Sequence, residues 1–159
     1  MTKAMPKVTA ARAPHLLLVE APYYTHIAAL LREGAEKALA AAGATFEVIQ
    51  VPGSFEIPGA IGIAARAGGK YDGFVALGCV IRGETTHYDH ICEATADWLQ
   101  RLAVSDGLAI GYGILTCENE QQALHRANPG GNGRDHGGAA VRACLAMVGV
   151  KRRFAGEGG

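Results

Sequence analysis

One short stretch, from Leu77 to His90, limits most strongly what this chain can fold into. It begins as an apolar run typical of a buried strand, breaks at Arg82-Gly83, and offers Thr85 or Thr86 as a helix cap. Apolar residues then recur at three- and four-residue steps through residues 91–102, which predicts a long helix. The stretch is therefore a strand, a polar turn and a helix. In a parallel sheet such turns lie at the carboxyl ends of the strands, where ligands bind.

The composition is that of an ordinary globular chain. Of 159 residues, 49% are hydrophobic and 19% are charged, which fits one domain with a packed core. The 15 basic and 15 acidic residues cancel, so the basic surplus usual in nucleic-acid-binding proteins is missing. The apolar run Leu16–Val19 is too short for a signal peptide, and no run approaches the ~20 apolar residues of a membrane span. We therefore expect a cytoplasmic protein, with its cysteines as buried thiols rather than disulfides.

Strand-like and helix-like segments alternate along the chain. The expected strands are Leu16–Val19, Phe46–Val51, Phe74–Ile81 and Leu108–Leu115; Thr116 is expected to cap a helix across Glu118–Ala127. This alternation predicts a flavodoxin-like, three-layer α/β/α fold with a four-stranded, doubly wound parallel sheet. We expect one domain over residues 15–154, with a flexible arm at 1–14 and a loose tail at 155–159.

Three polar turns meet at the switch point if the strand order is flavodoxin-like. They are Pro22–Thr25, Gly53–Glu56 and Arg82–His87. His87 can act as a general acid and base near neutral pH, or simply cap and pack the helix. Glu56 can accept hydrogen bonds from a polyol or an amine, or cap the next helix.

Other polar and aromatic residues each allow two interpretations. Arg82 and Arg126 can hold a phosphate by paired hydrogen bonds, or lie on the surface as solvated cations. Tyr23 and Tyr112 can stack on a flat heterocycle, or pack at the strand ends. A metal site near His87 is disfavoured, because neither HExxH nor CxxC spacing is present.

Three blocks of sequence together resemble the 6,7-dimethyl-8-ribityllumazine synthase family. They are Val51-Pro52-Gly53-Ser54-Phe55-Glu56-Ile57-Pro58, then Gly78 to Asp89, and then Gly113-Ile114-Leu115-Thr116-Cys117-Glu118-Asn119 with Arg126. The resemblance spans roughly residues 15 to 152. It implies condensation of 5-amino-6-(D-ribitylamino)uracil with 3,4-dihydroxy-2-butanone 4-phosphate, with no metal or redox cofactor.

The resemblance also implies a role for each matching position. For the pyrimidine and the ribityl chain, it points to an aromatic stack, polyol contacts and backbone contacts from Tyr23, Ser54, Phe55, Glu56, Cys79, Val80 and Ile81, with Tyr112 in place of a usual phenylalanine. For the phosphate, it points to Gly83, Glu84 and Thr85 together with Arg126. His87 would carry protons. In the family, the residues at positions 112 and 126 reach into the site of a neighbouring subunit.

Two departures from the family pattern bear on assembly and affinity. The family often carries Gly-Asn-Lys-Gly before the last helix, whereas this chain has a longer segment, residues 131–138, in which Arg134 or His136 can replace the lysine. In the family a longer loop here accompanies free pentamers, so we expect a homopentamer with its site between adjacent subunits. Pro22-Tyr23-Tyr24 stands where Arg-Phe-Asn is common, which predicts altered affinity only.

Two functional classes remain open at this point. The first is the enzyme. The second is a non-catalytic pentameric paralogue that binds a flavin or lumazine without turnover. The presence of both His87 and Arg126 favours the enzyme. A flavodoxin-type flavin carrier is disfavoured, because its phosphate loop follows the first strand rather than the third.

Overall fold

The computed structural model describes residues 12–156, and within them the chain builds one parallel sheet in the order β2-β1-β3-β4. The strands are β1 (His15–Glu20), β2 (Thr45–Gln50), β3 (Gly73–Ile81) and β4 (Ile110–Cys117). The helices are α1 (Thr25–Ala41), α2 (Ile57–Arg66), α3 (His87–Asp106), α4 (Glu120–Ala127) and α5 (His136–Ala155), with a 3-10 turn, η1, at Ser54–Glu56. The predicted fold class and the flavodoxin-like strand order are confirmed.

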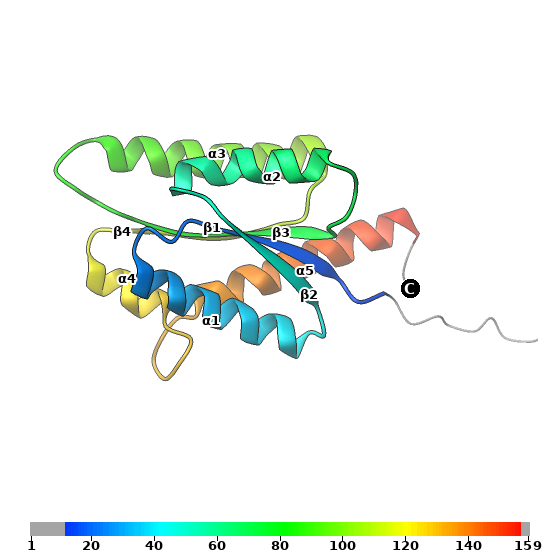
Figure 1. Cartoon of the computed structure of the whole chain (residues 1–159), viewed down its shortest axis with the longest axis horizontal. Helices are drawn as coiled ribbons and strands as arrows, with labels where there is room; N and C mark the ends of the chain where they lie inside the picture. Colours follow the sequence, from blue (N-terminus) through cyan, green and yellow to red (C-terminus); the bar gives the residue numbers. More distant parts are fainter. Residues whose placement is uncertain (1–11, 157–159) are drawn as a thin grey trace, which may run out of the picture.

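Helices cover both faces of the sheet, as Figure 1 shows: α2 and α3 lie on one side, and α1, α4 and α5 on the other. The alternation of side chains along β1 supplies both cores. Leu16 and Leu18 face the α1 and α5 side, whereas Leu17 and Val19 face the α2 and α3 side. Burial on both faces explains why this strand reads as an unbroken apolar run.

The last helix completes the larger core. Four residues of α5 join the buried side chains of β1 and β3: Ala140, Val141, Cys144 and Val148. The helix comes so close to β4 that a Cβ placed on Gly111 would lie 2.0 Å from the carbonyl oxygen of Ala140. Only glycine leaves room for this contact.

Two expected boundaries are wrong. Strand β4 begins at Ile110 rather than at Leu108, because Gly107 ends α3 in the left-handed conformation (φ 64°) and the two following residues cross to the sheet. Thr116 does not cap α4, since it is still paired with Val80 inside the sheet. Asn119 caps the helix instead, and its side chain accepts a hydrogen bond from the backbone N–H of Gln122 at 2.9 Å.

The predicted ends of the domain fall partly outside the described residues. Positions 1–11 of the expected arm and 157–159 of the expected tail are among those not described. The described part of the arm includes Arg12, which forms an ion pair with Asp72 at 2.7 Å. Helix α5 runs to Ala155.

All four cysteines lie within the described residues and carry free thiols. Cys79, Cys117 and Cys144 are buried, as expected, whereas Cys92 is only half-buried. From residue 12 to residue 156, no helix combines the length and the apolar character needed to cross a membrane.

Candidate active site

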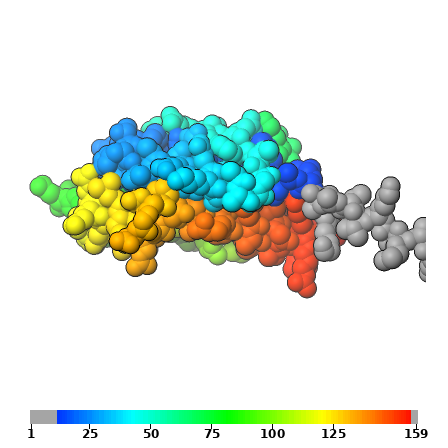
Figure 2. All heavy atoms as spheres, turned by 90° about the horizontal axis from the view of Figure 1, so that it is seen from below, coloured from blue at the N-terminus to red at the C-terminus, as the bar shows by residue number. Residues whose placement is uncertain are grey.

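The carboxyl ends of β1, β2 and β3 surround a cleft of about 630 Å³. Residues from all three polar turns line it, as expected from the strand order: Tyr23, Tyr24, Pro52, Gly53, Ser54, Phe55, Glu56, Cys79, Val80, Ile81, His87 and Ile91. The turn between β3 and α3 projects beyond the rest of the molecule at this end (Figure 2, green). Tyr23, Phe55 and His87 are exposed, so the cleft is open to solvent.

Two tyrosines form the first wall of the cleft. The rings of Tyr23 and Tyr24 meet edge to face, with centroids 5.0 Å apart. The ring of Tyr23 is 74% exposed, so one face can receive a flat ligand. Burial raises the pKa of the Tyr24 hydroxyl, and Cys79 and Tyr23 add to the shift. Tyr24 therefore stays a neutral hydrogen-bonding group throughout the neutral pH range.

The loop after β2 forms the second wall. Ser54 is 8% exposed and lies against β3, where a Cβ on Gly78 would come within 2.7 Å of the Ser54 hydroxyl oxygen. Because Gly78 has no side chain, the Ser54 hydroxyl can lie close to β3 at the bottom of the cleft. Phe55 and Glu56 are exposed beside it. The wall combines a hydroxyl, an aromatic ring and a carboxylate, which suits a polyol joined to a ring.

The end of β3 forms the floor. Cys79 is buried, and burial followed by the nearby Cys117 raises the pKa of its thiol to about 12. The thiol is therefore not a nucleophile at neutral pH. Val80 and Ile81 are half-buried next to it. The polar groups that this segment offers to a ligand are those of its backbone.

His87 opens helix α3 and reaches the cleft from the side. Thr86 is the N-cap residue, but its hydroxyl makes no capping hydrogen bond; the hydroxyl of Thr85 instead accepts one from the backbone N–H of His87 at 3.3 Å. Gly83, Glu84 and Thr85 are exposed in the turn and do not line the cleft. The first backbone amides of α3 follow this turn, and the N-terminus of a helix favours a bound anion.

Arg82 is committed to neighbouring side chains rather than to the cleft. Its guanidinium donates to both carboxylate oxygens of Asp89, at 3.2 and 3.3 Å, and its Nε donates to Glu118 at 2.8 Å. It also lies 4.3 Å from the ring centroid of Tyr88. With two carboxylates on one cation, this group has little capacity left for a phosphate.

Three further basic residues lie away from the cleft. Arg126 lies in the last turn of α4, Arg134 lies in the loop that follows, and His136 begins α5. Burial lowers the pKa of His136, and the positive charges of Arg126 and Arg134 lower it further. The negative charge of Asp135 opposes this shift. None of the three basic residues lines the cleft of the same chain.

Tyr112 is also separate from the cleft. It lies on β4 beside α3, where it lines a shallow hollow with Leu99, Gln100 and Ala103 among others. Its hydroxyl has a raised pKa, mainly because the ring is partly buried. On one chain, therefore, His87 lines the cleft, whereas Arg126 on α4 and Tyr112 beside α3 lie outside it.

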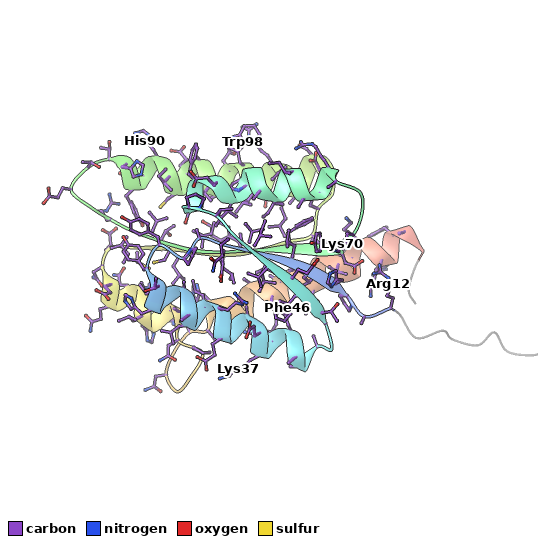
Figure 3. All side chains as sticks on the ribbon, in the orientation of Figure 1. Arg12, Lys37, Phe46, Lys70, His90 and Trp98 are labelled. Atoms are coloured by element: carbon purple, nitrogen blue, oxygen red, sulfur yellow. The ribbon has the colours of Figure 1, made fainter. Side chains whose placement is uncertain are left out.

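The described residues offer no cluster for a metal ion. Between residues 12 and 156, no three His, Cys, Asp or Glu side chains are grouped as ligands. His87 lines the cleft, whereas His90 is exposed on the outer side of α3 (Figure 3).

Tyr24 and Ile91 line the cleft although sequence reasoning assigned them no functional role. Ile91 reads as an ordinary member of the apolar helix face. Tyr24 could have been found from its position, because it directly follows Tyr23 in a turn expected at the switch point. Neighbouring residues in such a turn can both face the ligand.

Comparison with known proteins gives a consistent result over most of the chain. Residues 13–152 match the family model for 6,7-dimethyl-8-ribityllumazine synthase. The chain is 49% identical to 6,7-dimethyl-8-ribityllumazine synthase 1 of Rhizobium meliloti, covering 90% of this chain and 95% of the relative. It is 50% identical to the 6,7-dimethyl-8-ribityllumazine synthase of Agrobacterium fabrum, covering 90% and 98%. The enzyme of the same name from Sphingopyxis alaskensis is 47% identical, covering 88% and 96%.

Proposed function

This chain belongs to the 6,7-dimethyl-8-ribityllumazine synthase family, and we propose that the cleft at the ends of β1, β2 and β3 is where it performs the family's reaction. The enzyme is a transferase of riboflavin biosynthesis. It condenses 5-amino-6-(D-ribitylamino)uracil with 3,4-dihydroxy-2-butanone 4-phosphate to 6,7-dimethyl-8-ribityllumazine, releasing phosphate and water. The observation that carries the location is the meeting of an open aromatic face, a polyol-binding wall and a histidine in one cleft.

The aminouracil occupies the cleft with its ring against Tyr23. The exposed ring face of Tyr23 supplies the stacking surface, and the backbone of Cys79, Val80 and Ile81 reads the pyrimidine edge. The ribityl chain follows the loop after β2, where Ser54 and Glu56 exchange hydrogen bonds with its hydroxyls. Phe55 lies beside them and shields the chain from water.

His87 moves the protons of the reaction. The ring amine of the aminouracil attacks the ketone, and loss of water gives an imine. Loss of a proton from the adjacent hydroxyl-bearing carbon then expels phosphate and gives an enol, which takes up a proton on carbon and becomes a new ketone. The ribitylamino nitrogen attacks this ketone, and a second water is lost. Each step transfers protons and none transfers electrons, so one imidazole beside the reacting atoms suffices. Holding the two substrates together supplies a further share of the acceleration.

The phosphate of the second substrate is held from two sides. Gly83, Glu84 and Thr85 cradle it with backbone groups of the turn and the first amides of α3. Arg126 neutralises its charge, with Arg134 and His136 in the place of the family's lysine. Because these cations lie away from the cleft of their own chain, they serve the cleft of an adjacent subunit, as does Tyr112.

A homopentamer accommodates this arrangement. A surface that fits a different surface on the next copy closes into a ring when the rotation closes. The exposed aromatic side chains Tyr112 and Trp98, from β4 and α3, supply apolar area for such a contact. Sedimentation or light scattering should give five chains per particle, whereas a capsid-sized particle would contradict the pentamer. Four free thiols fit the reducing environment of the cytoplasm.

An absorbance assay tests the function directly. The purified protein is mixed with both substrates, and lumazine formation is compared with the uncatalysed background. Turnover above that background supports the enzyme. Tight binding of riboflavin or the aminouracil without turnover would instead identify a non-catalytic binding paralogue.

A further inference from the structure

A buried carboxylate at the end of β1 has no part in the chemistry described above. Glu20, the last residue of β1, is 5% exposed. Its Oε1 accepts a hydrogen bond from Arg32 of α1 at 3.0 Å and another from Gln50 of β2 at 2.8 Å. Burying a carboxylate is unfavourable unless it is paired, and a buried ion pair often contributes little net stability compared with apolar side chains of the same size.

The backbone of the same residue makes a second connection. The carbonyl of Glu20 accepts a hydrogen bond from the backbone N–H of Val51 at 2.9 Å, and the next N–H, that of Ala21, donates to Leu77 of β3 at 2.9 Å. Main chain and side chain thus hold the ends of three neighbouring strands together. Both connections lie where the strands pass into the loops that carry the cleft residues.

The cleft walls begin within a few residues of this joint. Tyr23 follows Glu20 by three positions, and Ser54 follows Gln50 by four. Glu20 also shares a narrow crevice with Tyr24 and Cys79, both of which line the cleft. Glu20 therefore lines a crevice together with two of the residues that form the ligand surface.

We propose that Glu20 is a positioning residue that sets the spacing between the tyrosine wall and the Ser54–Glu56 wall, and so controls affinity for the aminouracil. This inference rests on the proposed function, because it takes the cleft as the aminouracil site. The second substrate, held by its phosphate at the turn before α3 and by the partner cations, is contacted by neither wall. The two substrates should therefore respond differently to a change at Glu20.

The first test is Glu20→Gln, which keeps the size of the side chain and removes its charge. We expect the Michaelis constant for the aminouracil to rise about tenfold, because two charge-assisted hydrogen bonds are weakened, while that for the butanone phosphate changes less than about twofold. The matched control is Glu36→Gln. Glu36 binds the same Arg32 at 2.7 Å on the exposed surface of α1, and its loss should leave both constants unchanged.

A second variant guards against misfolding of the first. Gln50→Ala removes the side-chain link between β1 and β2 but leaves the Glu20–Arg32 pair in place. We expect the Michaelis constant for the aminouracil to rise about threefold, because one neutral amide donor is lost. The constant for the butanone phosphate should again stay nearly unchanged. Thermal unfolding of every variant shows whether it is folded. Selective loss of aminouracil affinity in a folded variant supports positioning.

Two results would overturn the proposal. One is an equal change in both Michaelis constants; the other is a lowered melting temperature with both constants intact, which would make Glu20 purely structural. Failure of the proposed function would look different. In that case Ser54→Ala and Tyr23→Ala, which alter the cleft surface itself, would also leave aminouracil affinity unchanged.

Discussion

The guanidinium of Arg82 donates two hydrogen bonds to the carboxylate of Asp89, at 3.2 and 3.3 Å, and so links the end of β3 to the first turn of α3. Glu118, in the loop after β4, accepts a third hydrogen bond from Nε of Arg82. The short turn between Arg82 and His87 is therefore closed at its base by ion pairs. A turn that must carry a proton-transferring side chain gains a defined geometry from this arrangement.

We expect Arg82→Ala to lower kcat clearly and to change the free energy of unfolding only slightly. Arg82 and its two carboxylate partners are exposed, so the free energy of unfolding should change little, whereas His87 loses the support of its turn. Steady-state kinetics and urea unfolding would measure the two effects. Lys37→Ala, which removes an ion pair with Glu33 on α1, should change neither kcat nor KM.

His87→Ala should reduce kcat by about a hundredfold or more, because the general acid and base is removed, while the Michaelis constants stay within a few-fold of their original values. His90→Ala on the exposed side of the same helix serves as the control. Unaltered turnover of the His87 variant would remove this residue from the proton transfers.

Arg126→Ala should raise the Michaelis constant for the butanone phosphate by about tenfold or more, because a charge-assisted contact to phosphate is lost. Affinity for the aminouracil should be unaffected. If the constant does not move, Arg134 or His136 holds the phosphate without help from Arg126.

Mixing the His87→Ala and Arg126→Ala variants tests the shared site, with turnover measured at a butanone phosphate concentration well below the raised Michaelis constant of the Arg126 variant. Each His87→Ala chain retains an intact Arg126, and each Arg126→Ala chain retains an intact His87. After equal amounts are unfolded together and reassembled, about a quarter of the interfaces should combine an intact His87 with an intact Arg126 from the neighbour. Recovered turnover near this fraction supports a site built from two chains, and no recovery would place both residues in one chain's site.

Gly111→Ala should destabilise the fold by about 3 kcal/mol, because the added Cβ would lie 2.0 Å from the carbonyl oxygen of Ala140 and the helix would have to move. Gly149→Ala is the matched control on α5. No atom lies within 4 Å of a Cβ at this position, so the change should be neutral or stabilise the helix. Thermal unfolding distinguishes the two.

His136 should make the protein less stable as the pH falls below its ordinary pKa of 6.5. Burial, followed by Arg126 and Arg134, lowers the pKa of His136 in the folded protein. The unfolded chain therefore takes up a proton first as the pH decreases, and stability is lost between pH 6.5 and the lowered folded value. His136→Gln should flatten this part of the stability curve, whereas His125→Gln, an exposed residue on α4, should not.

Much of the cleft could be foreseen because its residues follow strands directly. Val80 and Ile81 end an apolar run, and the turn after them stands at a switch point once the order of the strands is known. Asn119 was missed as the cap of α4 because Thr116 offers the same chemistry three residues earlier. Only the pairing of Thr116 with Val80 in the sheet decides between them, and that pairing depends on distant parts of the chain.

Glu20 shows the limit of reading local pattern. In the sequence it is a charged residue that ends an apolar strand, which describes many exposed strand ends. Its burial depends on Arg32 and Gln50 arriving from two other elements. Contacts of this kind form only when the elements pack together, so no sequence motif predicts them.

The position of α5 over β1 and β3 also bears on how the protein is made. The sheet can begin at β1 and grow outward as β2 and β3 leave the ribosome, but the apolar face of Leu16, Val75 and Leu77 stays open until α5 arrives. Because α5 follows all four strands in the chain, that face is covered only after residues 136–155 have been synthesised. A nascent chain that stalls before residue 136 would expose a hydrophobic sheet, and such a chain is a natural client for chaperones.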